Sequence, residues 1–120
     1  MSGHRAAHDM AKAPLQLTDG GDASIIGIDR FGGIVELETA AAETRTLADP
    51  IGGGLMATVR MRVDGGDCTV TATNGLNVAA NTTAVFADVG DLLHMVSVET
   101  ATAGTFRWEI LTNTGSVALS

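Results

Sequence analysis

The stretch from Leu55 to Val63 alternates between apolar and polar side chains. The apolar members share one face of an extended strand: Leu55, Ala57, Val59, Met61 and Val63. Thr58, Arg60 and Arg62 lie on the other face. This alternation predicts a strand with one face in a core and the other in water. Residues 68–73 (CTVTAT) repeat the pattern.

Strand-like runs recur at regular intervals along the rest of the chain, with Gly, Asn or Asp between them. The further runs are SIIGI, GGIVELE, TAVFADVG, LLHMVSVET, GTFRWEIL and GSVALS. Regularly spaced short strands are typical of an all-β sandwich or small barrel. We therefore expect residues 23–120 to form an all-β domain, a small sandwich or barrel of short antiparallel strands.

Residues 1–22 lack the strand pattern and are polar, rich in Ala and Gly-terminated. We expect an extended N-terminal arm that orders on contact with another molecule, with a plain disordered tail as the alternative. The segment APLQL places Leu15 and Leu17 two positions apart. That spacing suits an edge strand added to a neighbouring subunit, so these leucines are the candidate contact residues of the arm.

The segment DGGD occurs twice in the chain, at residues 19–22 and 64–67, and a related segment, DVGD, lies at residues 88–91. The second lies between two alternating strands, and its glycines can supply the positive φ of a tight hairpin turn. A calcium loop needs about six to eight oxygen ligands in a different array. We interpret these segments as turns, with a weak cation site as the alternative.

Composition limits both the core and the partners. The chain has 120 residues with 45% hydrophobic, but only three Phe, one Trp and no Tyr. A core this thin predicts that stability comes in part from self-association, as a trimer, or from contact with another protein. The net charge of −7 disfavours binding to nucleic acid or to anionic membranes. The absence of a signal peptide or membrane span favours a soluble protein made in a cytoplasm.

The residues that could act in catalysis or bind a metal do not form a recognisable active site. His4 and His8 are one helical turn apart but lack a third metal ligand. His94 has no adjacent nucleophile and carboxylate, so we expect a core or interface histidine. Cys68 alternates with apolar residues and is expected to be a buried small hydrophobe. We therefore predict no enzyme activity, no metal and no cofactor.

The segment GTFRWEIL concentrates the scarce aromatic residues. Phe106, Trp108 and Ile110 lie on one face of this strand, where they either anchor the core or meet a neighbouring subunit. On an earlier strand, Glu36 and Glu38 also share a face. We expect that face to be solvated.

Residues 43–120 resemble the short β modules of tailed-bacteriophage structural proteins. The segments that carry the resemblance are ETRTLADPIGGG, VDGGDCTVTATNG, TAVFADVGD and RWEILTNTGSV. Similar modules occur in capsid decoration (cement or head-stabilising) proteins and in head or tail fibres. A short chain with an N-terminal arm and no repetitive shaft favours the decoration proteins.

This resemblance implies a structural protein of the virion that binds the major capsid protein on the capsid exterior. Decoration proteins of this sort are often trimers at capsid symmetry axes, with arms that reach over neighbouring coat subunits. Leu15 and Leu17 would then be capsid-binding residues. The alternative is a receptor- or glycan-binding β module of a phage head or tail fibre, which should expose aromatic rings for sugars to stack on.

Overall fold

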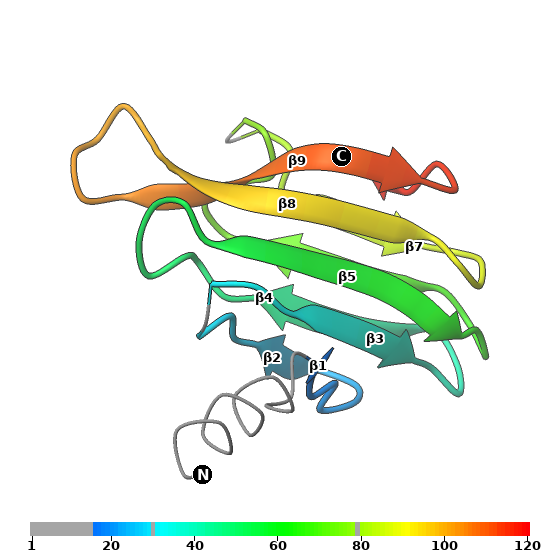
Figure 1. Ribbon diagram of the computed structural model, residues 1–120. Coiled ribbons are helices and arrows are strands. Elements are labelled where there is room, and N and C mark those ends of the chain that lie inside the picture. The colour runs from blue at the N-terminus through cyan, green and yellow to red at the C-terminus, as the bar shows by residue number, and fades with distance from the viewer. Residues whose placement is uncertain (1–15, 30, 79) are drawn as a thin grey trace, which may run out of the picture.

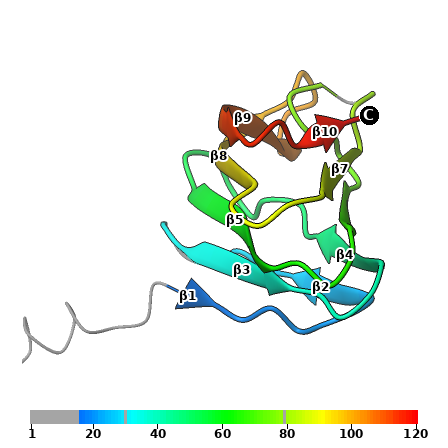
Figure 2. The ribbon, with the colours of Figure 1, turned by 90° about the vertical axis from the view of Figure 1, so that its right-hand side faces the viewer.

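The computed structural model describes residues 16–29, 31–78 and 80–120, and within these ranges it contains β-strands and no helix. The strands form two five-stranded sheets that pack face to face (Figures 1 and 2). The first sheet has, in spatial order, β1 (Gln16–Leu17), β3 (Ile34–Glu38), β5 (Met56–Val63), β8 (Leu92–Glu99) and β9 (Phe106–Thr114). The second has β10 (Ala118–Leu119), β7 (Thr83–Phe86), β6 (Cys68–Ala72), β4 (Glu43–Leu47) and β2 (Ser24–Ile26). The predicted all-β fold is confirmed.

The pairing directions differ from the antiparallel arrangement that the sequence predicted. Antiparallel pairs join β5 to β8, β8 to β9, β6 to β7 and β7 to β10. Parallel pairs join β1 to β3, β3 to β5, β2 to β4 and β4 to β6. The chain passes from one sheet to the other and back, so successive strands enter each sheet in the same direction. The first part of the fold is therefore a stack of coils, as in a β-solenoid.

The Asp-Gly segments are corners between the sheets. Residues 19–22 join β1 to β2, residues 64–67 join β5 to β6, and residues 88–91 join β7 to β8, all at one end of the sandwich (Figure 1). The interpretation of residues 64–67 as a hairpin turn is therefore wrong, because β5 and β6 lie in different sheets. Both strands alternate in the same way, and alternation alone does not say which strands pair.

The two glycines of the 64–67 corner are required for close approach rather than for an unusual φ. Positive φ values occur at Gly21 (91°) and Gly90 (92°), but Gly65 and Gly66 lie outside the left-handed region. A Cβ atom on either residue would collide with the backbone of residues 39–42, the corner of the preceding coil. The corners thus stack backbone against backbone, at a separation that only glycine permits.

Thr39 joins the two stacked corners by hydrogen bonds in which it acts both as a donor and as an acceptor. Its hydroxyl donates to the carbonyl oxygen of Gly66 (2.7 Å) and accepts from the N–H of Gly65 (3.1 Å). Its own N–H donates to the carbonyl oxygen of Val63 (3.0 Å). At the corner the backbone groups no longer pair with a neighbouring strand, and these bonds give them partners. Partners are needed because Thr39 is buried, away from water.

The core fills the space between the sheets. The alternation in β5 and β6 correctly predicted the inward side chains Ala57, Val59, Met61, Cys68, Val70 and Ala72. Val63, by contrast, is 43% exposed, because β5 ends there and the chain leaves for the second sheet. Trp108 and Phe86 are the large aromatic members of the core, and both are buried. The indole N–H of Trp108 donates to the carbonyl oxygen of Ala48 (3.1 Å).

Residues 16–22, which the sequence assigned to the arm, pack on the domain. Gln16 and Leu17 form β1 and lie opposite Ile34 and Val35 of β3, and Leu17 is buried. Leu17 therefore adds a strand to its own chain, whereas the sequence suggested a strand added to a neighbour. A strand of two residues is too short to show alternation, which explains the difference. Leu15 and the rest of residues 1–15 lie outside the described residues.

Candidate interaction surface

A buried ionic cluster holds the corner between β1 and β2 to β4. Arg45 points inward from β4 with its side chain 0% exposed. Its guanidinium donates to Asp19 through Nε–H (Oδ1, 2.6 Å) and an Nη2–H (Oδ2, 3.0 Å). Further bonds run to Glu43 (3.1 Å) and to the carbonyl oxygens of Glu38 (3.1 Å) and Thr44 (3.0 Å). The buried charge is therefore fully partnered, and its role is structural.

The same cluster sets the protonation of its members. Burial acts to raise the pKa of Asp19, but hydrogen bonds from Arg45 and from the N–H groups of Glu38 and Gly21, with the charge of Arg45, lower it below its usual value. The hydrogen bond to Asp19 raises the pKa of Arg45. Burial raises the pKa of the Cys68 thiol to about 11. The thiol is therefore protonated at neutral pH, which makes it a poor nucleophile.

The outer face of the first sheet carries a grid of charged side chains. Glu36 and Glu38 of β3 lie beside Arg60 and Arg62 of β5. Ion pairs join Arg60 to Glu36 (3.0 Å) and Arg62 to Glu38 (2.9 Å) and to Glu36 (3.7 Å). The pairs are at least partly exposed, as the sequence predicted for the two glutamates, so each contributes about 0–1 kcal/mol. The grid fixes a charge pattern on the surface more than it stabilises the fold.

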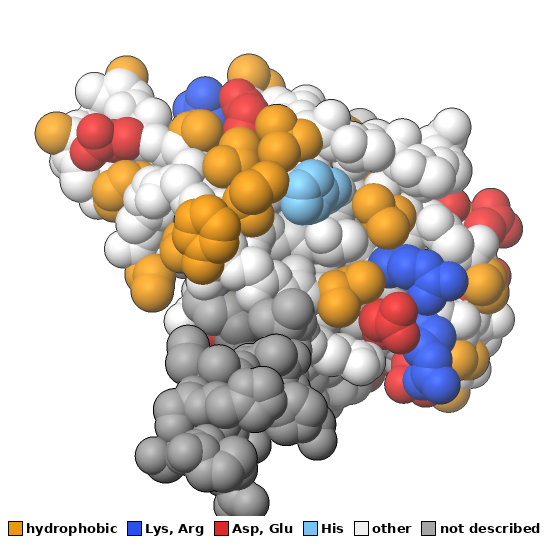
Figure 3. Space-filling model, viewed as in Figure 1, with side chains coloured by type: hydrophobic (Ala, Val, Ile, Leu, Met, Phe, Trp, Pro, Cys, Tyr) orange, Lys and Arg blue, Asp and Glu red, His pale blue; other side chains and the backbone are white. Residues whose placement is uncertain are grey.

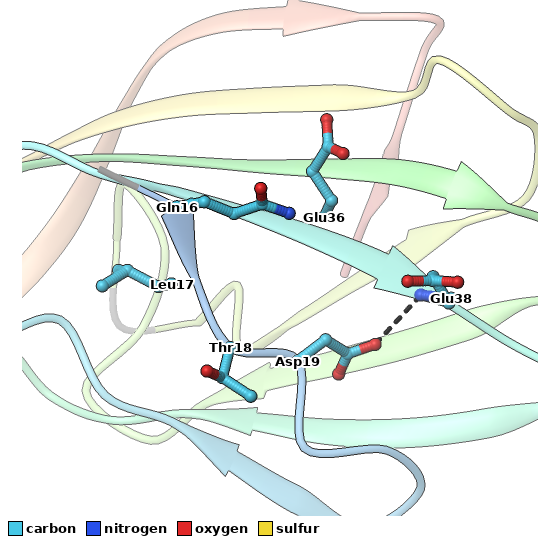
Figure 4. Close-up of a pocket in the computed structure, with 6 residues that line it drawn as sticks. All are labelled: Gln16, Leu17, Thr18, Asp19, Glu36 and Glu38. Carbon is cyan, nitrogen blue, oxygen red and sulfur yellow. Dashed lines mark hydrogen bonds between the residues drawn. The ribbon is translucent and has the colours of Figure 1, made fainter. Parts of the chain in front are cut away.

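A hollow of about 420 Å³ lies beside this grid, at the edge formed by β1 and β3 (Figure 4). Its lining includes three carboxylates, and the Glu38 N–H donates to Asp19 across it (2.9 Å). Each carboxylate is already paired: Asp19 with Arg45, Glu36 with Arg60, and Glu38 with Arg62. Among residues 16–29, 31–78 and 80–120, no three His, Cys, Asp or Glu side chains are grouped to hold a metal ion.

Apolar side chains occupy much of the rest of this face. The members that stand half-buried on the outside of the first sheet are Ile34, Met56, Leu92, Val96 and Val98. Figure 3 shows hydrophobic side chains gathered beside the histidine, with acidic and basic side chains next to one another further along. We call the half-exposed and exposed outward side chains of β3, β5 and β8 the outer face. It presents apolar and charged halves side by side.

His94 lies in the middle of the outer face. Its Nδ1 is 2.9 Å from the hydroxyl oxygen of Thr58, the residue opposite it on β5. The inward side chains of β8 are Leu93, Met95 and Ser97. The expectation of a core histidine is therefore wrong, while an interface role stays a prediction. Both faces of β8 are largely apolar, so the sequence pattern did not distinguish inward from outward positions.

Phe106, Trp108 and Ile110 of β9, which the sequence marked as a core or interface anchor, differ in how deeply they are buried. Trp108 is 1% exposed and belongs to the core. Ile110 is half-buried and packs against the core cluster. Phe106 is half-buried, and its ring lies beside Gly53 in the connection between β4 and β5. Only Phe31 among the aromatic residues is largely exposed (72%), and no pattern in the sequence marked it.

Comparison of the chain with protein-family models gave no match, and comparison with curated proteins gave none either. In the part of the chain that the structure describes, no helix is long and apolar enough to cross a membrane.

Proposed function

We propose that this protein is a structural component of a phage virion, a decoration protein that binds the major capsid protein on the capsid exterior. The observation that carries the proposal is the outer face, where half-exposed apolar side chains cover part of an otherwise regular sheet. Apolar surface next to a polar, charged region is the composition of a protein–protein interface. The resemblance of residues 43–120 to tailed-phage β modules supports the same assignment.

The proposed mechanism is bridging between coat subunits. Each copy, made in the host cytoplasm, adds to the assembled shell and buries the apolar half of the outer face against coat protein. Opening the shell then requires those contacts to break, so occupancy stabilises the capsid. The protein would act as a homotrimer, since a core with few aromatic residues gains stability from association. The acidic chain, with its net charge of −7, suits a surface that faces away from DNA.

The alternative, a glycan-binding fibre module, requires exposed aromatic rings. The chain has three Phe and one Trp. Phe86 and Trp108 are buried, and Phe31 is the one ring that is mostly exposed. A single ring gives a sugar one stacking surface, so this alternative has less support than the decoration role.

The test is co-sedimentation with capsids assembled from the major capsid protein of the phage genome that encodes this chain. Val96 stands on the outer face in β8, and Val85 stands on the outside of the second sheet in β7. Both are half-exposed on interior strands. We expect Val96→Asp to abolish co-sedimentation and Val85→Asp to leave it intact. Failure of the wild-type chain to bind, or equal binding by the two variants, would contradict the proposal.

A further inference from the structure

A second hollow lies at the end of the sandwich opposite the Asp-Gly corners, and its volume is about 370 Å³. It is formed by the connection between β6 and β7 and by the loop between β8 and β9, which projects from that end (Figure 1). The polar side chains that line it are Thr73, Asn74, Thr100, Thr102, Thr105 and Arg107. Arg107 is the cross-strand neighbour of Val98, so the hollow adjoins the outer face.

Arg107 differs from the other arginines that the structure describes. Arg45, Arg60 and Arg62 each donate hydrogen bonds to carboxylates. Arg107 makes none to any described residue, although its Nε is buried. Its ionic neighbour is Glu109, whose Oε1 lies 3.8 Å from Nε and is also buried without a hydrogen-bond partner. Glu109 therefore opposes the charge of Arg107 without a hydrogen bond, and the terminal N–H groups of the guanidinium have no acceptor among the described residues. Such a guanidinium can bind an oxyanion through two parallel N–H bonds.

The walls of the hollow combine free hydroxyls with fixed backbone. The hydroxyls of Thr73 and Thr105 make no hydrogen bond to described residues, so both can bond to a ligand. Asn74 is held by donating its Nδ2–H to the carbonyl oxygen of Phe106 (3.0 Å). The Thr100 hydroxyl braces the β8–β9 loop by accepting the N–H of Thr102 (3.2 Å). The free donors therefore stand on a preformed frame, which lowers the entropy cost of binding.

The surrounding charges restrict the kind of anion that fits. Glu109 faces Arg107, while Asp49 accepts the N–H of Asn74 (3.1 Å) and Glu99 accepts the N–H of Gly104 (2.8 Å). One cation among three carboxylates disfavours a doubly charged phosphate more strongly than a singly charged carboxylate. A single carboxylate matches the single guanidinium, and hydroxyl or amide groups next to it can meet the threonines.

We propose that this hollow binds a carboxylate that is flanked by hydroxyl or amide groups. Its volume suits a ligand the size of a monosaccharide or an amino acid. An acidic sugar and an acidic amino-acid residue carry the same chemistry, and both would pair with Arg107. The proposal does not rest on the proposed function, and it is testable on the isolated chain.

The experiment is an amide NMR titration of the full-length protein with glucuronate, N-acetylaspartate α-methylamide (which has one free carboxylate), glucose and inorganic phosphate. We expect saturable shifts at Thr73, Asn74 and the 100–107 segment with at least one of the two carboxylates. Glucuronate alone would identify an acidic sugar, and N-acetylaspartate α-methylamide alone an acidic residue. Glucose or phosphate binding as tightly as both carboxylates, or the absence of saturable shifts, would overturn the proposal.

Variants test the role of the guanidinium. We expect Arg107→Gln to lower the affinity about tenfold or more, the effect of losing a charge-assisted bidentate pair. Arg60→Gln removes an arginine from the charged grid and should leave the titration unchanged. If Arg107→Gln fails to fold, Thr105→Val provides the test, with an expected loss of severalfold. Unchanged affinity in the folded Arg107→Gln variant, or in Thr105→Val where that variant replaces it, would refute the assignment.

Discussion

Asp19 and Arg45 are joined by two hydrogen bonds, Oδ1 to Nε at 2.6 Å and Oδ2 to Nη2 at 3.0 Å. Asp19 lies in the connection between β1 and β2, and Arg45 lies in β4, so the pair fixes that connection to β4. The side chain of Asp19 is 8% exposed, so water does not replace the carboxylate if it is removed. The ion pair is therefore one of the contacts that fix the first coil of the fold, together with buried Leu17 and the pairing of β1 with β3.

Substitution of Asp19 by Asn should destabilise the protein. Removing one partner of a buried pair costs about 3–5 kcal/mol when the other charge is left alone. Glu43 and two carbonyl oxygens still accept from Arg45, so we expect the lower part of that range or somewhat less. Urea denaturation at neutral pH measures the difference. Asp22→Asn is the control for a nearby exposed carboxylate, and an equal effect in both variants would contradict the assigned role.

The contribution of Asp19 should also depend on pH in a defined direction. The folded-state pKa of Asp19 lies below its ordinary value, which is about 3.9 in an unfolded chain. The stabilisation is therefore present above that unfolded value and is lost as the pH falls through the folded-state pKa. The stability difference between the wild type and Asp19→Asn should shrink on acidification below about pH 4. A difference that stayed constant from neutral to acid pH would contradict this linkage.

Gly66 should tolerate no side chain. A Cβ atom there would collide with the backbone between Ala41 and Ala42, which has little freedom to move. We expect Gly66→Ala to cost about 1–3 kcal/mol or more, as for overpacking elsewhere. Gly27 has no heavy atom near its Cβ position and no positive φ, so Gly27→Ala should be neutral or slightly stabilising. Chemical denaturation of both variants checks the contrast, and similar stabilities would contradict close corner stacking.

The sequence predicted those features of the fold that depend on local alternation. The inward faces of β5 and β6 follow from a period of two. For Trp108 the sequence left the core and an interface as alternatives, and the 1% exposure of the side chain assigns it to the core. Pairing is not local, so the parallel coils and the inter-sheet position of residues 64–67 were not predictable from alternation. The outer face of β8 was missed because both of its faces are apolar. Arg107 was missed because a guanidinium that lacks hydrogen-bond acceptors leaves no pattern in the sequence.

Cys68 should be unreactive in the folded protein. Its side chain is buried, and burial raises the thiol pKa to about 11. Since the thiolate is the reacting form, labelling by a thiol reagent at about pH 8 should require unfolding. We expect slow labelling in native buffer and rapid labelling in denaturant. Rapid labelling of the native chain would show that the corner beside Cys68 opens readily.

Trp108→Ala should be among the most damaging single substitutions. The side chain is 1% exposed, and its indole N–H donates to Ala48 across the core. Truncation of a buried Trp costs about 3–5 kcal/mol through lost transfer energy and the cavity left behind. Leu111 lies on the same strand but is 54% exposed, so Leu111→Ala should cost little. If Trp108→Ala melts like the wild type, Trp108 does not anchor the core.

Two truncations distinguish the contribution of residues 16–22 to stability from that of residues 1–15. Deleting residues 1–15 keeps β1 and Asp19, and this chain is the reference for the second truncation. Deleting residues 1–22 also removes the buried Leu17 and the partner of Arg45. That loss should exceed the effect of Asp19→Asn, because apolar burial worth about 1.5–3 kcal/mol is removed along with the ion pair. Denaturation of the two truncated chains gives the comparison. Equal free energies of unfolding would mean that residues 16–22 contribute nothing to the domain, contrary to the packing of β1 on β3.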